Sequence, residues 1–159
     1  MNKKQMNQKL DLQNLKLKAA NYCAYQERSV LEVKQKLNKL GANQAQVIQI
    51  VDELIAEGFI DEARFAHVYA NGKFRQNKWG KLKIACALKK KGINENLIEE
   101  ATGGIDENIY LDTLRKLVEK KNTIIKDDDP WVRKNKIAQS VTLKGFEAEL
   151  VLSVINDVL

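Results

Sequence analysis

Three glycines with matching surroundings constrain the fold of this chain more than any other feature. Gly41, Gly92 and Gly145 are separated by 51 and 53 residues. Apolar residues stand eight and four positions before each glycine and six and nine positions after it: Val33, Leu37, Val47, Ile50; Ile84, Leu88, Ile98, Ala101; Ile137, Val141, Val151, Val154. These offsets follow the period of an α-helix on both sides of the glycine. Each glycine therefore marks a corner between two helices, because glycine readily adopts the left-handed conformation that ends a helix.

Residues that favour helix starts stand just beyond these corners. Asn43 and Asn94 follow the first two glycines at the N-cap position, and Glu147 takes the same place at the third. Asp129 followed by Pro130 is a further start signal, because proline at the first helical position loses no hydrogen bond. The sequence therefore predicts a second helix after each corner.

A third helix precedes each pair. The segments GFIDEARF (58–65) and GGIDENIY (103–110) match each other, and their aspartates can cap a new helix. The stretch 15–28 takes this place in the first copy, and Ser29 caps the helix that follows it. We therefore expect nine helices in three triplets: an all-α, elongated and curved array in which each triplet packs mainly on its neighbours.

The repeats predict the organisation of the chain. We expect a polar tail at residues 1–14, partly disordered up to about residue 12, followed by repeats at 15–58, 59–104 and 105–159. No segment approaches the roughly 20 apolar residues that a membrane-spanning helix needs, and the N-terminus lacks the apolar core of a secretory signal. We expect a cytoplasmic monomer that does not associate with membranes.

Nothing in the sequence indicates an enzyme or a cofactor. Cys23 and Cys86 lack metal-ligand spacing, and we expect both to be buried or half-buried thiols. His67 has no accompanying nucleophile, and the acidic run at 127–129 is interpreted as a loop and cap. Trp131 is expected in core or corner packing. Phosphate-binding loops, dinucleotide motifs and hydrolase motifs are absent from the sequence.

Charge is sorted by helix. The helices before the three glycines (29–40, 80–91 and 131–144) contain twelve Lys or Arg residues and one acid, Glu32. The helices after the glycines (43–57, 94–102 and 147–158) contain nine acids and no Lys or Arg. Helix dipoles explain cations near a helix C-terminus, but they oppose the cations near the starts of these helices. The net charge of +6 is compatible with an acidic partner.

The densest basic segment is Lys73–Lys91, which has eight Lys or Arg residues and no acid. Phe74 and Trp79 lie within it, and such a pattern can bind phosphates and stack bases. The alternative is a solvated face, with Trp79 packed as a staple against Ile84. The candidate contact residues for a protein or DNA partner are Lys73, Arg75, Lys78, Lys81, Lys83, Lys89, Lys90, Lys91, Arg133, Lys134 and Lys136.

Three segments of the chain resemble the bacterial RecX family: 19–41, 57–70 and 79–93. The first has a serine that opens a helix ending in Leu-x-x-x-Gly, at Ser29, Leu37 and Gly41. The second has the pattern Gly-aromatic-Ile-Asp-Glu-x-Arg-Phe-Ala at 58–66, and the third has a basic helix ending in Leu-x-x-Lys-Gly-Ile at 88–93. The resemblance covers about residues 15–159 and is strongest over 19–101. Ala87 departs from the pattern, since the family often has an acid there.

The resemblance implies a regulator without catalytic activity. Members of the family bind RecA and its filament on DNA, and they inhibit strand exchange and the coupled ATP hydrolysis. The expected partners are therefore RecA, the RecA–DNA filament and possible direct contacts to single- or double-stranded DNA. The residues themselves leave open a second interpretation, a helical protein that binds nucleic acid without sequence preference and without RecA.

Overall fold

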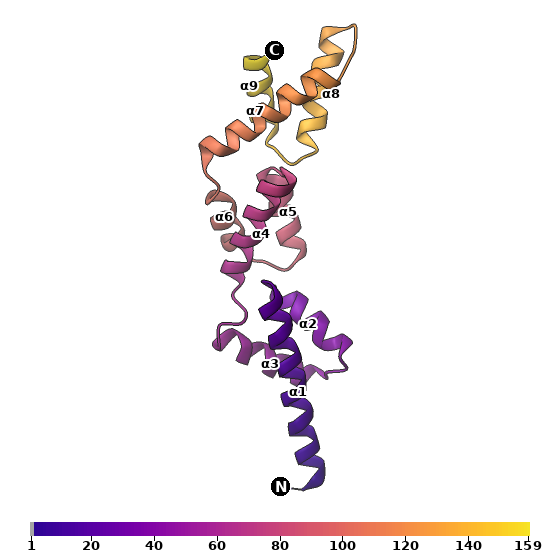
Figure 1. The fold of residues 1–159 in the computed structure, drawn as a ribbon, viewed down its shortest axis with the longest axis vertical. Coiled ribbons are helices and arrows are strands. Elements are labelled where there is room, and N and C mark those ends of the chain that lie inside the picture. The colour runs from indigo at the N-terminus through magenta and orange to yellow at the C-terminus, as the bar shows by residue number, and fades with distance from the viewer. Residues whose placement is uncertain (1) are drawn as a thin grey trace.

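The computed structural model describes residues 2–159 and consists, within that range, of nine α-helices and no strand. The helices are α1 (Lys3–Tyr25), α2 (Val30–Lys39), α3 (Gln44–Ala56), α4 (Glu62–Asn77), α5 (Lys81–Lys90), α6 (Glu95–Gly103), α7 (Glu107–Ile124), α8 (Pro130–Thr142) and α9 (Ala148–Val158). They form three successive triplets along one long axis (Figure 1). The expected all-α array of three-helix repeats is confirmed.

The corner glycines have the backbone conformation that the sequence predicts. Their φ angles are 87° at Gly41, 78° at Gly92 and 98° at Gly145. A side chain would strain this left-handed conformation. The expected caps also form, because the side chains of Asn43 and Asn94 accept hydrogen bonds from the first turns of α3 and α6.

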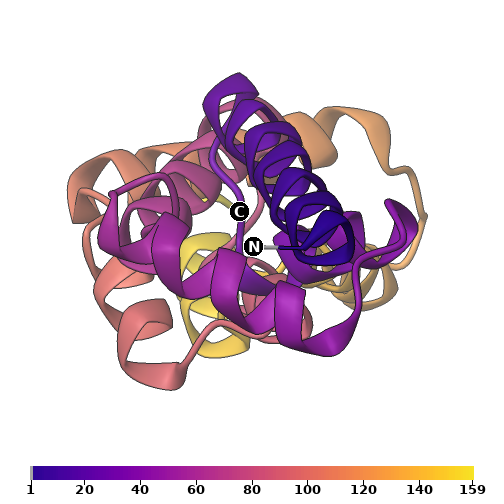
Figure 2. The same ribbon diagram turned by 90° about the horizontal axis from the view of Figure 1, so that it is seen from below.

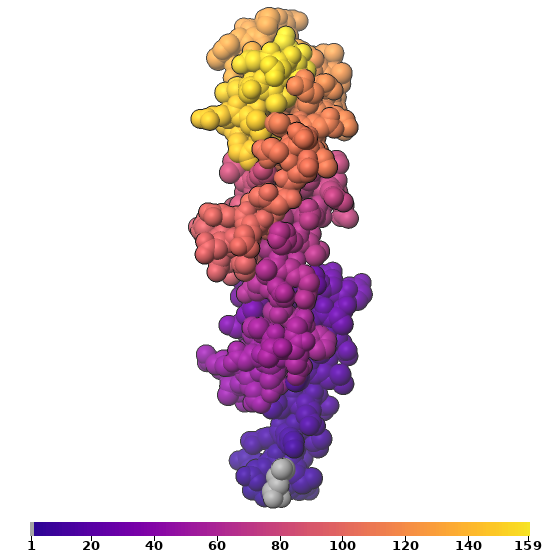
Figure 3. All heavy atoms as spheres, turned by 90° about the vertical axis from the view of Figure 1, so that its left-hand side faces the viewer, coloured from indigo at the N-terminus to yellow at the C-terminus, as the bar shows by residue number. Residues whose placement is uncertain are grey.

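One local expectation is wrong. Residues 3–14 are not a disordered tail, because they are the first half of α1 and extend beyond the rest of the first triplet (Figures 1 and 3). Asn2 and Gln5 form a capping box that starts this helix. Glu147 stands at the N-cap position of α9, as expected, but its side chain makes no cap hydrogen bond. Its carboxylate instead accepts a hydrogen bond from the hydroxyl of Tyr110, at 3.0 Å.

The hydrophobic core is divided unequally among the triplets. The first triplet has a core of its own, which includes Val33, Leu37 and Leu54. The second and third triplets share one continuous core, which runs from Phe65 to Ile155. The molecule therefore consists of one separate triplet and one fused pair. We call the contact between the first and second triplets the first joint, and the contact between the second and third the second joint.

The first joint is polar. Arg64 of α4 pairs with Glu27 at 2.5 Å, and Lys91 pairs with Glu32 of α2 at 2.7 Å. Burial of the Glu62 carboxyl raises its pKa, and the Val30 backbone and Lys34 of the first triplet partly oppose that rise. One oxygen of Glu62 and one of Glu27 are buried without a hydrogen-bond partner in the described part of the chain.

The second joint is aromatic and close. Tyr110 of α7 lies between Phe74 of α4 and Phe146, with ring centroids 5.7 and 5.0 Å away. The N–H of Gly80 donates to the carbonyl oxygen of Lys144 at 2.7 Å. The two backbones are so close that a Cβ on Gly80 would lie 2.3 Å from the carbonyl carbon of Gly145. This contact explains why both positions are glycine.

The triplets follow one another along a narrow body. In the view along the long axis, the helices of the three triplets overlap one another (Figure 2). The start of α1 and the end of α9 lie at opposite ends of this body (Figure 1). No helix within residues 2–159 is both long enough and apolar enough to cross a membrane.

Candidate functional site

The basic side chains of the 73–91 segment do not form one open track. Lys73 and Lys83 lie over the ring of Trp79, with Nζ 5.0 and 4.6 Å from the ring centroid. Trp79 itself packs against the core that contains Ile84, as the staple interpretation predicts. Much of this aromatic surface is thus covered by the protein's own cations.

Two further lysines of the segment serve the joints. Lys81 pairs with Glu107 at 3.0 Å across the second joint, and Lys91 makes the ion pair with Glu32 across the first. The Nζ of Lys78 donates to the carbonyl oxygen of Arg75 at 2.8 Å. The first role of these cations is therefore structural.

The candidates on α8 are divided in the same way. Arg133 donates to the carbonyl oxygens of Asn122 and Ile125, at 2.5 and 3.1 Å, and so caps the end of α7. Lys136 pairs with Asp127 at 2.9 Å, and this lysine holds the pKa of the Asp127 carboxyl below its usual value. Asp129 caps α8, as expected from the acidic run.

Four of the predicted contact residues remain available. The side chains of Arg75, Lys89, Lys90 and Lys134 form no ion pair, hydrogen bond or cation–π contact within residues 2–159, unlike the other seven. Arg75, Lys89 and Lys90 are exposed, and they belong to the middle triplet. Their positive charges are therefore not neutralised by any acid of the described residues.

Two other expectations about side-chain burial are wrong. Trp131 is 74% exposed on the first turn of α8, although an internal position was expected. Cys86 is exposed on α5, whereas Cys23 is buried as expected. Periodicity could not place either residue, because α8 and α5 each leave one face uncovered in this array. His67 is exposed, which agrees with a surface role.

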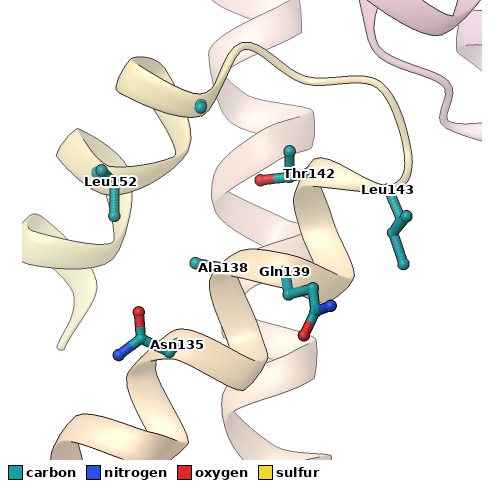
Figure 4. A pocket seen from close by; sticks show the side chains of 7 residues that line it. Asn135, Ala138, Gln139, Thr142, Leu143 and Leu152 are labelled. Carbon is teal, nitrogen blue, oxygen red and sulfur yellow. The ribbon is translucent and has the colours of Figure 1, made fainter.

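One groove on the third triplet is lined without any ionisable side chain. It lies between α8 and α9, has a volume of about 450 Å³, and is lined by Asn135, Ala138, Gln139, Thr142, Leu143, Ala148 and Leu152 (Figure 4). None of these side chains is titratable, so they cannot supply acid–base catalysis. Residues 2–159 also contain no cluster of three or more side chains suited to a metal ion.

A second cationic and aromatic cluster was not singled out from the sequence. It lies on the first triplet and contains Tyr22, Tyr25 and Arg28, with Lys18 and Lys36 beside them. The stretch NYCAYQER does place two tyrosines and an arginine at helical spacing. That signal was weaker than the run of lysines at 73–91, and only the fold brings Lys36 to it.

Comparisons with known proteins agree on one family. Residues 61–101 match the sequence profile of RecX, second three-helix domain. Regulatory protein RecX of Clostridium tetani is 32% identical over 130 residues, covering 80% of this chain and 59% of that protein. The crystal structure of RecX from Lactobacillus salivarius superposes with a TM-score of 0.85 at 28% identity, covering 93% of this chain and 96% of that one.

In sequence and in fold, the chain is similar to RecX proteins.

Other RecX relatives extend the comparison. Regulatory protein RecX of Clostridioides difficile is 27% identical over 144 residues, covering 91% of this chain and 68% of that protein. A second RecX crystal structure has the same fold, with a TM-score of 0.83 at 24% identity. The chain spans only 59% of the length of the C. tetani relative. The segment that matches the second three-helix domain of RecX, residues 61–101, is the middle triplet. This triplet contains Arg75, Lys89 and Lys90.

Proposed function

We propose that this RecX-like chain regulates RecA by binding RecA and its filament on DNA, and that it inhibits strand exchange and ATP hydrolysis. The observation that carries the proposal is the likeness to RecX over 93% of the chain. The elongated array supports it, because a narrow body can lie in the groove of a filament. The proposed protein is a cytoplasmic monomer without catalytic activity of its own.

The middle triplet is the proposed contact. Arg75, Lys89 and Lys90 are exposed there, so they can meet acidic protein surface or DNA phosphate without breaking an internal ion pair. Lys81, Lys83 and Lys91 are less suitable, because each already contacts an acid or an aromatic ring. Partner binding through those three would have to compete with contacts inside the protein.

The test measures RecA activity on single-stranded DNA. The purified chain should lower the ATPase and strand-exchange rates of RecA from the same organism at ratios up to one per RecA. The double variant Lys89→Glu/Lys90→Glu should weaken inhibition about tenfold or more, because charge reversal at an interface replaces attraction by repulsion. Absence of any effect of the native chain, together with no binding to the filament, would exclude the proposal.

A second candidate function is binding of nucleic acid without RecA. It is favoured by the net charge of +6 and by the cations that form no internal ion pair. Its signature would be an affinity for single-stranded DNA, in the absence of RecA, that falls with salt by a slope of about −0.7 per phosphate contact. Tight binding to RecA with no DNA binding at low salt would exclude this version.

A further inference from the structure

The first triplet contains a shallow cleft whose chemistry the RecA proposal does not use. The cleft lies between α1 and α2, has a volume of about 380 Å³, and is lined by Lys18, Asn21, Tyr22, Lys36 and Leu40. None of these lining residues is acidic. Phosphate groups are attracted to such a surface, since cations flank it on both helices.

Aromatic rings and cations alternate along one edge of this cleft. The guanidinium of Arg28 lies 3.7 Å from the ring centroid of Tyr22 and 6.0 Å from that of Tyr25. The Nζ of Lys36 lies 5.4 Å from the same Tyr22 ring. The Nε of Arg28 donates to the carbonyl oxygen of Tyr22 at 3.0 Å, which fixes the guanidinium plane over the ring. The turn between α1 and α2 therefore holds a rigid, positively charged platform.

Tyr25 is the open end of this platform. Its side chain is 84% exposed, the largest value among the exposed large apolar residues of the described chain. It belongs to neither hydrophobic core, so folding does not account for it. Lys18, Tyr22 and Tyr25 stand at positions i, i+4 and i+7 and thus share one face of α1.

We propose that this cleft binds single-stranded DNA, with a base stacked on Tyr25 and phosphates held by Lys18, Arg28 and Lys36. Exposed aromatic rings among cations suit unpaired bases, because every base offers a π-face while duplex DNA hides it. An acidic protein surface would use the cations but would leave the ring of Tyr25 without a role. The proposal rests on the second candidate function and gives it a location.

The test uses fluorescence anisotropy with a 20-residue oligothymidylate, without RecA, at several salt concentrations. Tyr25→Ala should weaken binding by at least about fivefold, the lower end of the loss expected for one stacked base. Tyr25→Phe should retain the native affinity, because the ring remains. Lys36→Gln should weaken binding and reduce the salt slope by about 0.7, the value for one phosphate contact.

Matched controls separate this cleft from general positive charge. Lys34→Gln removes the same charge from α2, but residues 34 and 36 point to different sides of the helix, so native affinity is expected. Lys89→Gln/Lys90→Gln removes charge from the middle triplet. In this background, Tyr25→Ala should reduce the affinity for the oligonucleotide by the same factor as in the native chain. Circular dichroism should be the same for all variants, because the altered side chains lie outside the cores.

Three outcomes would contradict the proposed cleft on the first triplet, nucleic-acid binding by the chain, or both. If the native chain binds the oligonucleotide but the cleft variants bind as tightly, the location is wrong and nucleic-acid binding stands. If the native chain does not bind at low salt, both are wrong. If the variants lose only RecA inhibition and retain DNA affinity, the cleft is a protein contact. In each case the RecA proposal is tested separately.

Discussion

At the scale of single residues, position in the array decides what a charged side chain does. Lys89 and Lys91 are two residues apart, yet Lys91 joins two triplets while Lys89 faces solvent. Glu62 stands at the start of α4 where Glu107 stands at the start of α7, and both belong to the same Ile-Asp-Glu pattern. Glu62 lies in the polar first joint, and its surroundings there disfavour its charge.

Glu62 should make the stability of the first joint depend on pH. Burial raises the pKa of this carboxyl above its ordinary value, although the Val30 backbone and Lys34 oppose the rise. The unfolded chain titrates at the ordinary value, so the folded state loses stability as pH rises from there through the raised pKa. Glu62→Gln should therefore raise Tm by a few °C at pH 7.

The pH profile of this variant provides the control. Below about pH 4 the native side chain is also largely neutral, so the gain from Glu62→Gln should disappear there. Thermal unfolding of both proteins from pH 3.5 to 7.5 measures the difference. An equal gain at all pH values would mean that charge on Glu62 does not destabilise the fold.

At the scale of elements, the second helices of the three triplets begin in different ways. Ser29 caps α2 within a capping box, and Asp129 caps α8. Gly80 has no side chain with which to cap α5. The first N–H groups of α5 instead donate to the next triplet: that of Lys81 to the hydroxyl of Tyr110, and that of Leu82 to the carbonyl oxygen of Gly145, both at 3.0 Å.

Gly80→Ala should break the second joint. The added Cβ would lie 2.3 Å from the Gly145 backbone, so the third triplet must move and the bonds that cap α5 must lengthen. We expect a loss of about 1–3 kcal/mol or more in the free energy of unfolding, as for other overpacked contacts. Urea unfolding followed by circular dichroism measures it.

Gly72→Ala is the matched control for this variant. Gly72 lies in the interior of α4, and nothing within 4 Å would meet an added Cβ there. The same chemical change should therefore be neutral or stabilise the protein by roughly 0.5–1 kcal/mol, because alanine favours helix. Equal effects of the two substitutions would contradict the close contact at the second joint.

At the scale of the whole molecule, the two joints differ in kind. The second joint continues a shared core, whereas the first connects two cores through ion pairs and buried carboxylates. Salt screens partly exposed ion pairs but has little effect on apolar packing. We therefore expect the orientation of the first triplet relative to the second to vary more than the orientation of the third triplet relative to the second.

Charge exchange at Glu32 and Lys91 tests this expectation. Glu32→Lys should broaden the distance distribution between spin labels on Cys86 and on Asp52→Cys, in a Cys23→Ser background, because like charges replace the ion pair. The double variant Glu32→Lys/Lys91→Glu should narrow the distance distribution again, because it restores the ion pair with its charges exchanged. A label pair across the second joint, on Cys86 and Ser153→Cys, should not respond. No broadening in the single variant would show that the ion pair does not hold the joint.

The sequence alone determined the helices, the glycine corners, most caps and the likeness to RecX, because these features depend on residues a few positions apart. Gly92 and Asn94 predict a corner between two helices without any knowledge of the surrounding structure. Only the tertiary structure decided which Lys and Arg side chains form contacts inside the protein. It also explained the close backbone contact at Gly80 and Gly145 and showed that Trp131 and Tyr25 are exposed. Those outcomes depend on pairs such as Lys91 with Glu32, 59 residues apart in the chain. Helical period cannot identify such pairs, because every outward face of a helix looks alike until its neighbours are placed.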